Sequence, residues 1–83
     1  GYTFKVNYRT QQEWTDGLVF KLFCKFSKGT EQAFVSAGHN NLKSGWHKTE
    51  INIPNVYRER YGYIEDYRVE MYSGGILVSI KSM

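Results

Sequence analysis

The chain has 83 residues, of which 41% are hydrophobic and 23% charged, and its formal net charge is +3. This length and composition are typical of one folded domain, residues 1–83, and exclude an intrinsically disordered chain. The single cysteine, Cys24, excludes a disulfide within the chain, and one cysteine with two histidines cannot complete the four-ligand site of a zinc finger.

Apolar and polar residues alternate along most of the chain, and this pattern predicts half-buried strands. In residues 2–9, Phe4, Val6 and Tyr8 share one face. In residues 17–26, every second residue from Leu18 to Phe26 is apolar. Residues 30–37 predict a third, shorter strand, and residues 46–53 a fourth that Pro54 ends, because proline cannot donate a backbone hydrogen bond.

Residues 10–29 also carry signals of a helix. Thr10 and Glu13 have the spacing of a capping box, and Gly29 would suit the end of a helix. Gly17 and the valine- and phenylalanine-rich run that follows favour a strand instead. We favour the strand; the alternative is an α+β fold with a helix near residues 11–28.

The last third of the sequence predicts a connection and then a hairpin. Residues 55–63 would form the connection, with one helical turn. We expect Tyr57 and Tyr61 to cover one end of the core, and the alternative is a ligand platform that they form with Arg58 and Arg60. Two alternating runs follow, joined by a turn at Gly74–Gly75 or at Ser73–Gly74. Both registers bury the same residues: Tyr67, Val69, Met71, Ile76, Val78 and Ile80. The predicted fold is all-β, a small antiparallel β-sandwich or partly open barrel of about six strands.

The sequence contains no recognisable catalytic or metal-binding motif. Cys24 lies on the apolar face of its strand, which predicts a buried, unreactive thiol. His47 shares a face with Ile51 and Ile53, so we expect it to be partly buried. Glu65 and Asp66 would point to opposite faces of a strand and could not act together. We therefore expect no enzyme activity, cofactor or metal, and the sequence carries no apolar run of the ~20 residues that span a membrane.

The outward faces of the predicted strands are basic and contain large aromatic residues. Three aromatic side chains, Phe23, Trp46 and Tyr72, lie among seven lysines and arginines and only two glutamates. Lysines are common on exposed strand faces because they oppose edge-to-edge aggregation, but aromatic residues are less easily explained in this way. The surface therefore suggests a binding role.

Carbohydrate is the leading ligand class for this surface. The rings of Trp46, Tyr72 and Phe23 would stack on sugar rings, and the polar loop before Trp46 would contribute His39, Asn40 and Asn41. In its pattern of strands and loop, though in no specific motif, the sequence resembles the β-sandwich carbohydrate-binding appendages of polysaccharide-degrading enzymes.

Two alternatives stay open at this point. One is a polyanion or single-stranded nucleic acid, whose phosphates would contact Lys5, Arg9, Lys21, Lys25 and Lys48 while bases stack on the aromatic rings. The other is a protein-interaction or inhibitor domain, because aromatic residues and arginine are enriched in protein interfaces. The sequence does not fix the compartment, and we favour an extracellular one.

Overall fold

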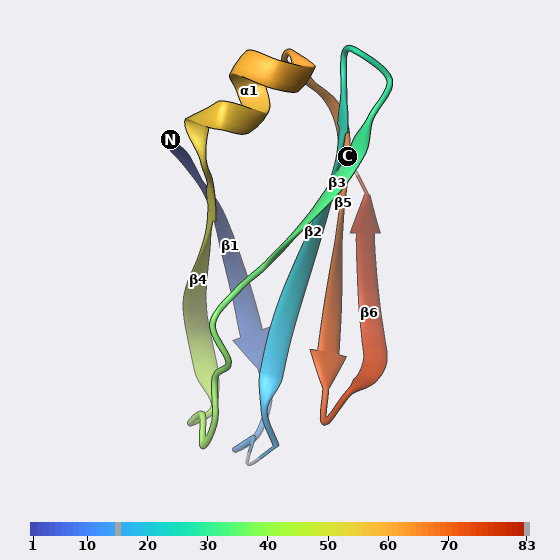
Figure 1. The fold of residues 1–83 in the computed structure, drawn as a ribbon. Coiled ribbons are helices and arrows are strands. Elements are labelled where there is room, and N and C mark those ends of the chain that lie inside the picture. The colour runs from blue at the N-terminus through green and yellow to red at the C-terminus, as the bar shows by residue number, and fades with distance from the viewer. Residues whose placement is uncertain (15, 83) are drawn as a thin grey trace.

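The computed structural model describes residues 1–14 and 16–82, with Tyr2 described by its backbone alone. These residues form six strands and one short helix (Figure 1). In chain order they are β1 (Tyr2–Thr10), β2 (Leu18–Phe26), β3 (Glu31–Val35), β4 (Gly45–Ile53), α1 (Asn55–Tyr61), β5 (Ile64–Ser73) and β6 (Ile76–Ser82). The prediction of a small all-β fold is confirmed.

The strands form two antiparallel sheets that face each other and do not close into a barrel. The smaller sheet contains β1 and β4, and the larger one has the order β3-β2-β5-β6. Aromatic pairs join the two layers: the ring centroids of Tyr8 and Phe20 lie 4.8 Å apart, and those of Phe4 and Tyr67 lie 4.9 Å apart. The arrangement is an open β-sandwich with a two-stranded layer on a four-stranded one.

The core is built mainly on β2, which pairs with β3 on one side and β5 on the other. Every second side chain of β2 is buried, as alternation predicts. Burying each such leucine or phenylalanine stabilises the fold by about 1.5–3 kcal/mol. The buried cluster consists of Phe20, Leu22, Cys24, Phe26, Phe34, Ile51 and Ile53. The helix alternative near residues 11–28 is therefore wrong for residues 18–26, which form a strand.

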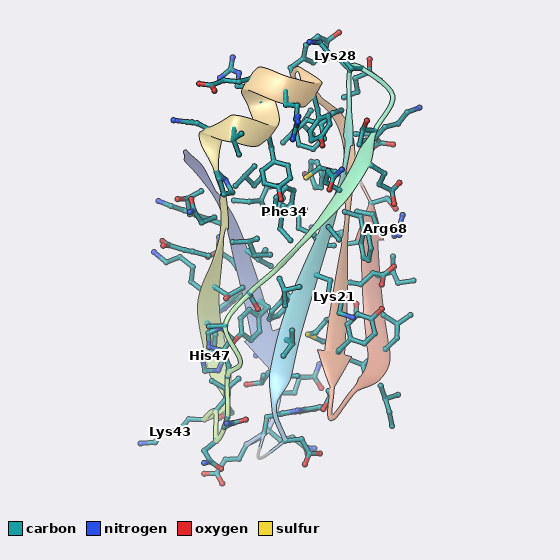
Figure 2. All side chains as sticks on the ribbon, viewed as in Figure 1. Lys21, Lys28, Phe34, Lys43, His47 and Arg68 are labelled. Atoms are coloured by element: carbon teal, nitrogen blue, oxygen red, sulfur yellow. The ribbon has the colours of Figure 1, made fainter. Side chains whose placement is uncertain are left out.

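Helix α1 closes one end of the sandwich (Figure 1). It begins after Pro54, whose extended backbone suits the residue that precedes a helix. The ring of Tyr57 meets that of Phe34 edge-on with centroids 4.8 Å apart, and Tyr61 lies 6.0 Å from Phe26. Figure 2 shows Phe34 beneath the helix. The two tyrosines thus cover the core end, as the sequence predicted.

Glycine is required where the chain leaves α1. Gly62 has a φ of 88°, a conformation that other residues rarely adopt, and a side chain there would collide with the hydroxyl of Ser27. The tight approach lets the backbone N–H of Ser27 donate to the carbonyl of Tyr63 at 2.8 Å. The turn after β2 is thereby fixed to the start of β5.

The β5–β6 hairpin is present, but its buried face differs from the prediction. Gly74 and Gly75 form the turn with φ values of 56° and 83°. A bulge between Met71 and Tyr72 then shifts the register, so that Met71 faces Ser79. The predicted burial of Ile76, Val78 and Ile80 is wrong, because every residue of β6 is exposed.

Candidate binding surfaces

The outer face of the two-stranded sheet carries the most exposed large aromatic residue of the described chain, Trp46, whose exposed fraction is 73%. Arg9 is its cross-strand partner, and Asn7 is opposite Lys48. A hollow beside the indole ring is lined by Asn7, Trp46, His47 and Lys48. We call this surface the Trp46 face, and its exposed members are Thr3, Lys5, Asn7, Arg9, Trp46, Lys48, Glu50 and Asn52.

The charge of the Trp46 face is positive. It holds three cations and one acid, and the acid, Glu50, lies 3.9 Å from the ammonium group of Lys48. Both side chains of that pair are half exposed, so the pair contributes little to stability. Lys5 and Arg9 form no ion pair with any described residue. A ligand at this face would therefore meet an open indole ring beside available positive charge.

The other two aromatic residues of the predicted site, Phe23 and Tyr72, lie on the outer face of the four-stranded sheet. They are thus on the opposite side of the sandwich from Trp46. The guanidinium carbon of Arg68 lies 4.3 Å from the centroid of Phe23, and the ammonium nitrogen of Lys21 lies 4.4 Å from that of Tyr72. These cations cover the ring faces that a sugar or base would need.

Glu70 holds Arg68 and Tyr72 of this second face in place. Its carboxylate accepts a hydrogen bond from the Arg68 guanidinium at 2.9 Å and another from the hydroxyl of Tyr72. These two hydrogen bonds lower the pKa of Glu70, Tyr72 first and Arg68 second, while the bond to Glu70 raises the pKa of Tyr72. The groups satisfy one another, so the network serves the sheet rather than a ligand.

The residues of the loop before Trp46 differ in how far they are exposed. His39 is half-buried, its backbone pairs with that of Leu18, and its Nε2 lies 2.7 Å from the hydroxyl oxygen of Thr49. It is therefore turned toward the space between the sheets. Asn40 and Asn41 are exposed at the loop tip. The structure thus brings neither His39 nor the Tyr72 and Phe23 rings onto the Trp46 face.

His47 has the half-buried position that its strand face predicted. Its Nε2 donates to the carbonyl oxygen of Lys43, which lies nearby in Figure 2, at 2.7 Å. Its ring lies 5.3 Å from that of Tyr8. These contacts fix the start of β4, next to Trp46. His47 thus supports the site from within.

The five cations proposed for a polyanion divide between the two outer faces. Lys5, Arg9 and Lys48 belong to the Trp46 face, whereas Lys21 and Lys25 lie on the larger sheet. Alternation alone showed that all five point outward. It could not show which sheet each strand joins, because that depends on the pairing of β1 with β4 across more than thirty residues of sequence.

The residues that the structure describes contain few groups suited to catalysis or metal binding. No three His, Cys, Asp or Glu side chains come together as a metal site would require. Cys24 is fully buried, and burial, with a smaller effect of Glu31, raises the pKa of its thiol from 9.0 to about 11. None of the described helical residues makes a helix long and apolar enough to cross a membrane.

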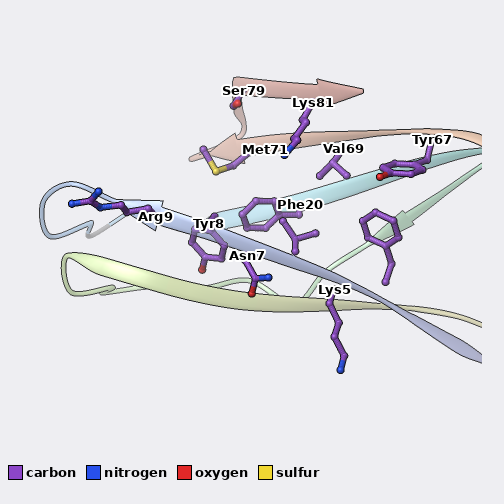
Figure 3. A pocket seen from close by; sticks show the side chains of 12 residues that line it. Lys5, Asn7, Tyr8, Arg9, Phe20, Tyr67, Val69, Met71, Ser79 and Lys81 are labelled. Carbon is purple, nitrogen blue, oxygen red and sulfur yellow. The ribbon is translucent and has the colours of Figure 1, made fainter. Parts of the chain in front are cut away.

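Sequence reasoning missed a cleft between β1 and the β5–β6 hairpin. Its volume is about 500 Å³, and we call it the β1–β6 cleft. Figure 3 shows its apolar part, with Tyr8, Phe20, Val69 and Met71 between the two layers. The further lining residues are Phe4, Lys5, Val6, Asn7, Arg9, Tyr67, Ser79 and Lys81. The only signal in the sequence was the apolar excess of β6, which the hairpin prediction had assigned to the core.

Comparison of the chain with protein-family models, curated proteins and solved structures finds no match to any of them. The surfaces of the domain are therefore the basis on which its function is inferred.

Proposed function

We propose that this domain is a non-enzymatic binding module that holds a carbohydrate on the Trp46 face, with acidic saccharides favoured over neutral ones. The observation that supports this is the highly exposed indole of Trp46 beside Arg9, which forms no ion pair with any described residue. An exposed indole is costly in water, and its apolar ring gains free energy when a sugar ring stacks on it. Among the aromatic residues first considered for the site, Trp46 alone keeps its ring free of a covering cation.

The polar residues of the Trp46 face suit a saccharide with acidic groups. Asn7 and Asn52 offer amide donors and acceptors for hydroxyl groups. Arg9 and Lys5 would pair with carboxylate or sulfate groups, and the planar guanidinium of Arg9 can bind such groups through two hydrogen bonds. Trp46 would supply stacking, and the cations would select charge. This division explains why an acidic ligand is the favoured one.

The experiment is affinity electrophoresis through gels that contain neutral or acidic polysaccharides. We expect retardation by acidic polysaccharides, and a loss of about tenfold in affinity in Trp46→Ala, equivalent to ~1.4 kcal/mol of lost stacking. Tyr63→Ala is the matched control, since Tyr63 is 63% exposed but lies outside the Trp46 face. No retardation by any polysaccharide, or an equal loss in both variants, would contradict the proposal.

A single-stranded oligonucleotide is the second probe, because nucleic acid would use the same ring and cations. Binding by several phosphate contacts weakens steeply with salt, whereas stacking on a sugar depends little on it. Retention of acidic polysaccharide that salt weakens only in part, because stacking on Trp46 persists, supports the carbohydrate. Binding of the oligonucleotide alone, with a steep salt dependence, would replace the carbohydrate by nucleic acid.

A further inference from the structure

The β1–β6 cleft lies where the small sheet ends and the large one continues. β1 pairs with β4 along one edge, and its other edge has no partner strand among the described residues. β6 extends the large sheet beyond β1, and all its residues are exposed. A third strand beside β1 would enlarge the small sheet and cover the uncovered side of β6. The backbone of β1 offers the unpaired N–H and C=O groups that such a strand requires.

The side chains around this edge define what an added strand would carry. On its inner side it would lie against Val6, Val69 and Met71, which are apolar and only half-buried. On its outer side it would lie beside Lys5 and Arg9, which Figure 3 shows projecting along and away from β1. Successive side chains of a strand alternate between these sides.

Charge complementarity fixes the nature of the outer residues. The charged residues that line the cleft are Lys5, Arg9 and Lys81, and no acidic residue lines it. Lys81 reaches from β6 toward the cleft in Figure 3. Acidic side chains on the outer side of an added strand would meet Lys5 and Arg9, whereas basic ones would be repelled, and Lys81 on the inner side of β6 adds to the positive charge around the strand.

We propose that the β1–β6 cleft binds an extended segment of a partner protein, about nine residues long, in which apolar and acidic residues alternate. The segment adds to the free edge of β1 as a third strand, and main-chain hydrogen bonds supply affinity while the cleft selects the side chains. The length follows that of β1, which has nine residues. The proposal does not depend on Trp46 or on carbohydrate binding.

A second copy of the chain fits this cleft less well. Two copies joined through their β1 edges would bring Lys5 and Arg9 of each next to the same cations of the other, and like charges on adjacent strands destabilise the pairing. A second copy that inserted β6 would bring Lys81 and no acidic residue, because β6 reads ILVSIKS. The charge of the cleft therefore favours a partner with acidic residues.

Fluorescence anisotropy with labelled synthetic peptides tests the occupant. We expect a nine-residue peptide of alternating valine and glutamate to bind at least ten times more tightly than the same peptide with lysine in place of glutamate. Two further peptides carry N-methyl groups on every second backbone nitrogen, one on the odd and one on the even positions. Only one of them should lose binding, because only one set of amides faces β1. Absence of binding by the glutamate peptide up to millimolar concentration would overturn the proposal.

Two serines of β6 provide matched variants that test the location. Ser79 faces the cleft opposite Met71, and Ser82 lies opposite Arg68 on the outer face; both are exposed, so neither substitution disturbs the core. Ser79→Trp should weaken the glutamate peptide at least tenfold, whereas Ser82→Trp should leave it unchanged. Lys81→Glu should also weaken it, and Trp46→Ala should not.

Sedimentation of the free protein completes the test. The proposal expects a monomer at the concentrations used for peptide binding. A dimer that Ser79→Trp dissociates, but that an excess of the glutamate peptide cannot dissociate, would show that a second copy fills the cleft. That result would overturn the proposal. Equal peptide binding by Ser79→Trp and the unmodified protein would overturn it as well.

Discussion

Strands β2 and β6 are both rich in apolar residues interrupted by polar ones, yet they have opposite environments. In β2, alternate residues are buried, and Leu22 has no exposed surface. In β6 every residue is exposed, including Ile80 with an exposed fraction of 55%. β2 lies between two strands and beneath the second sheet, whereas β6 is at the edge.

This difference shows that alternation determines that a segment is a strand but not that its apolar side is covered. Coverage depends on how many strands the opposite sheet contributes, and here it contributes two against four. The bulge at Met71–Tyr72 adds to the effect by placing Ser79 and Lys81 on the inner side of β6 and Ile80 on the outer side. The difference between β2 and β6 can be tested by making the same measurement on a residue of each strand.

The largest difference should appear in thiol labelling of an Ile80→Cys variant, which contains both an exposed and a buried cysteine. At pH 7.5 the introduced thiol should react at least about a thousandfold faster than Cys24, because Cys24 is reached only through unfolding. Within the folded chain the pKa near 11 also keeps this thiol protonated and unreactive. Mass spectrometry over time would show one rapid and one slow addition. Similar rates would mean that β2 opens as readily as β6.

Alanine substitutions give the next largest effect. Leu22→Ala should reduce the free energy of unfolding by about 2–5 kcal/mol, because it removes buried methyl groups and leaves a cavity. Ile80→Ala should change it by no more than about 0.5 kcal/mol, as expected for an exposed side chain. Urea titrations with equal slopes would measure both values. A large loss in Ile80→Ala would show that β6 is covered in solution.

The smallest effect concerns Glu70, which lies between Lys21 of β2 and Ile80 of β6 on the outer face. Because its pKa is lower in the fold than in the unfolded chain, the folded state binds fewer protons near pH 4. The stability from this network is therefore present above the ordinary value of 4.5 and is lost as the pH falls. Glu70→Gln should lower Tm at pH 7 by on the order of a few degrees and flatten its acid dependence. If the acid dependence of Tm is the same in Glu70→Gln as in the unmodified protein, other carboxylates are its cause.

Much of the fold could be predicted from local pattern. The strand at Leu18–Phe26, a hairpin turn near Gly74 and the helical turn after Pro54 each depend on neighbouring residues and were confirmed, and of the two predicted turn positions the structure has Gly74–Gly75. The burial of β6 could not be predicted, because a bulge in the hairpin and the width of the opposite sheet decide it. Both are properties of pairing between distant segments.

The residues of the candidate site were also only partly predictable from local pattern. The exposure of Trp46 followed from its place in an alternating strand and was confirmed. That Phe23 and Tyr72 would lie on the other sheet, under Arg68 and Lys21, could not be predicted without the pairing of β2 with β5. Alternation describes each strand alone, whereas a binding surface requires knowledge of which strands are neighbours.

The pairing of β1 with β4 has a consequence for how the chain is synthesised. Residues 2–10 leave the ribosome before their partner residues 45–53, which follow a few seconds later at ~5–20 residues per second. Until then the β2–β3 hairpin alone can form between close neighbours, and Phe4, Val6 and Tyr8 are open to chaperones. The fold should then assemble in milliseconds to seconds, the range typical of proteins dominated by such distant contacts.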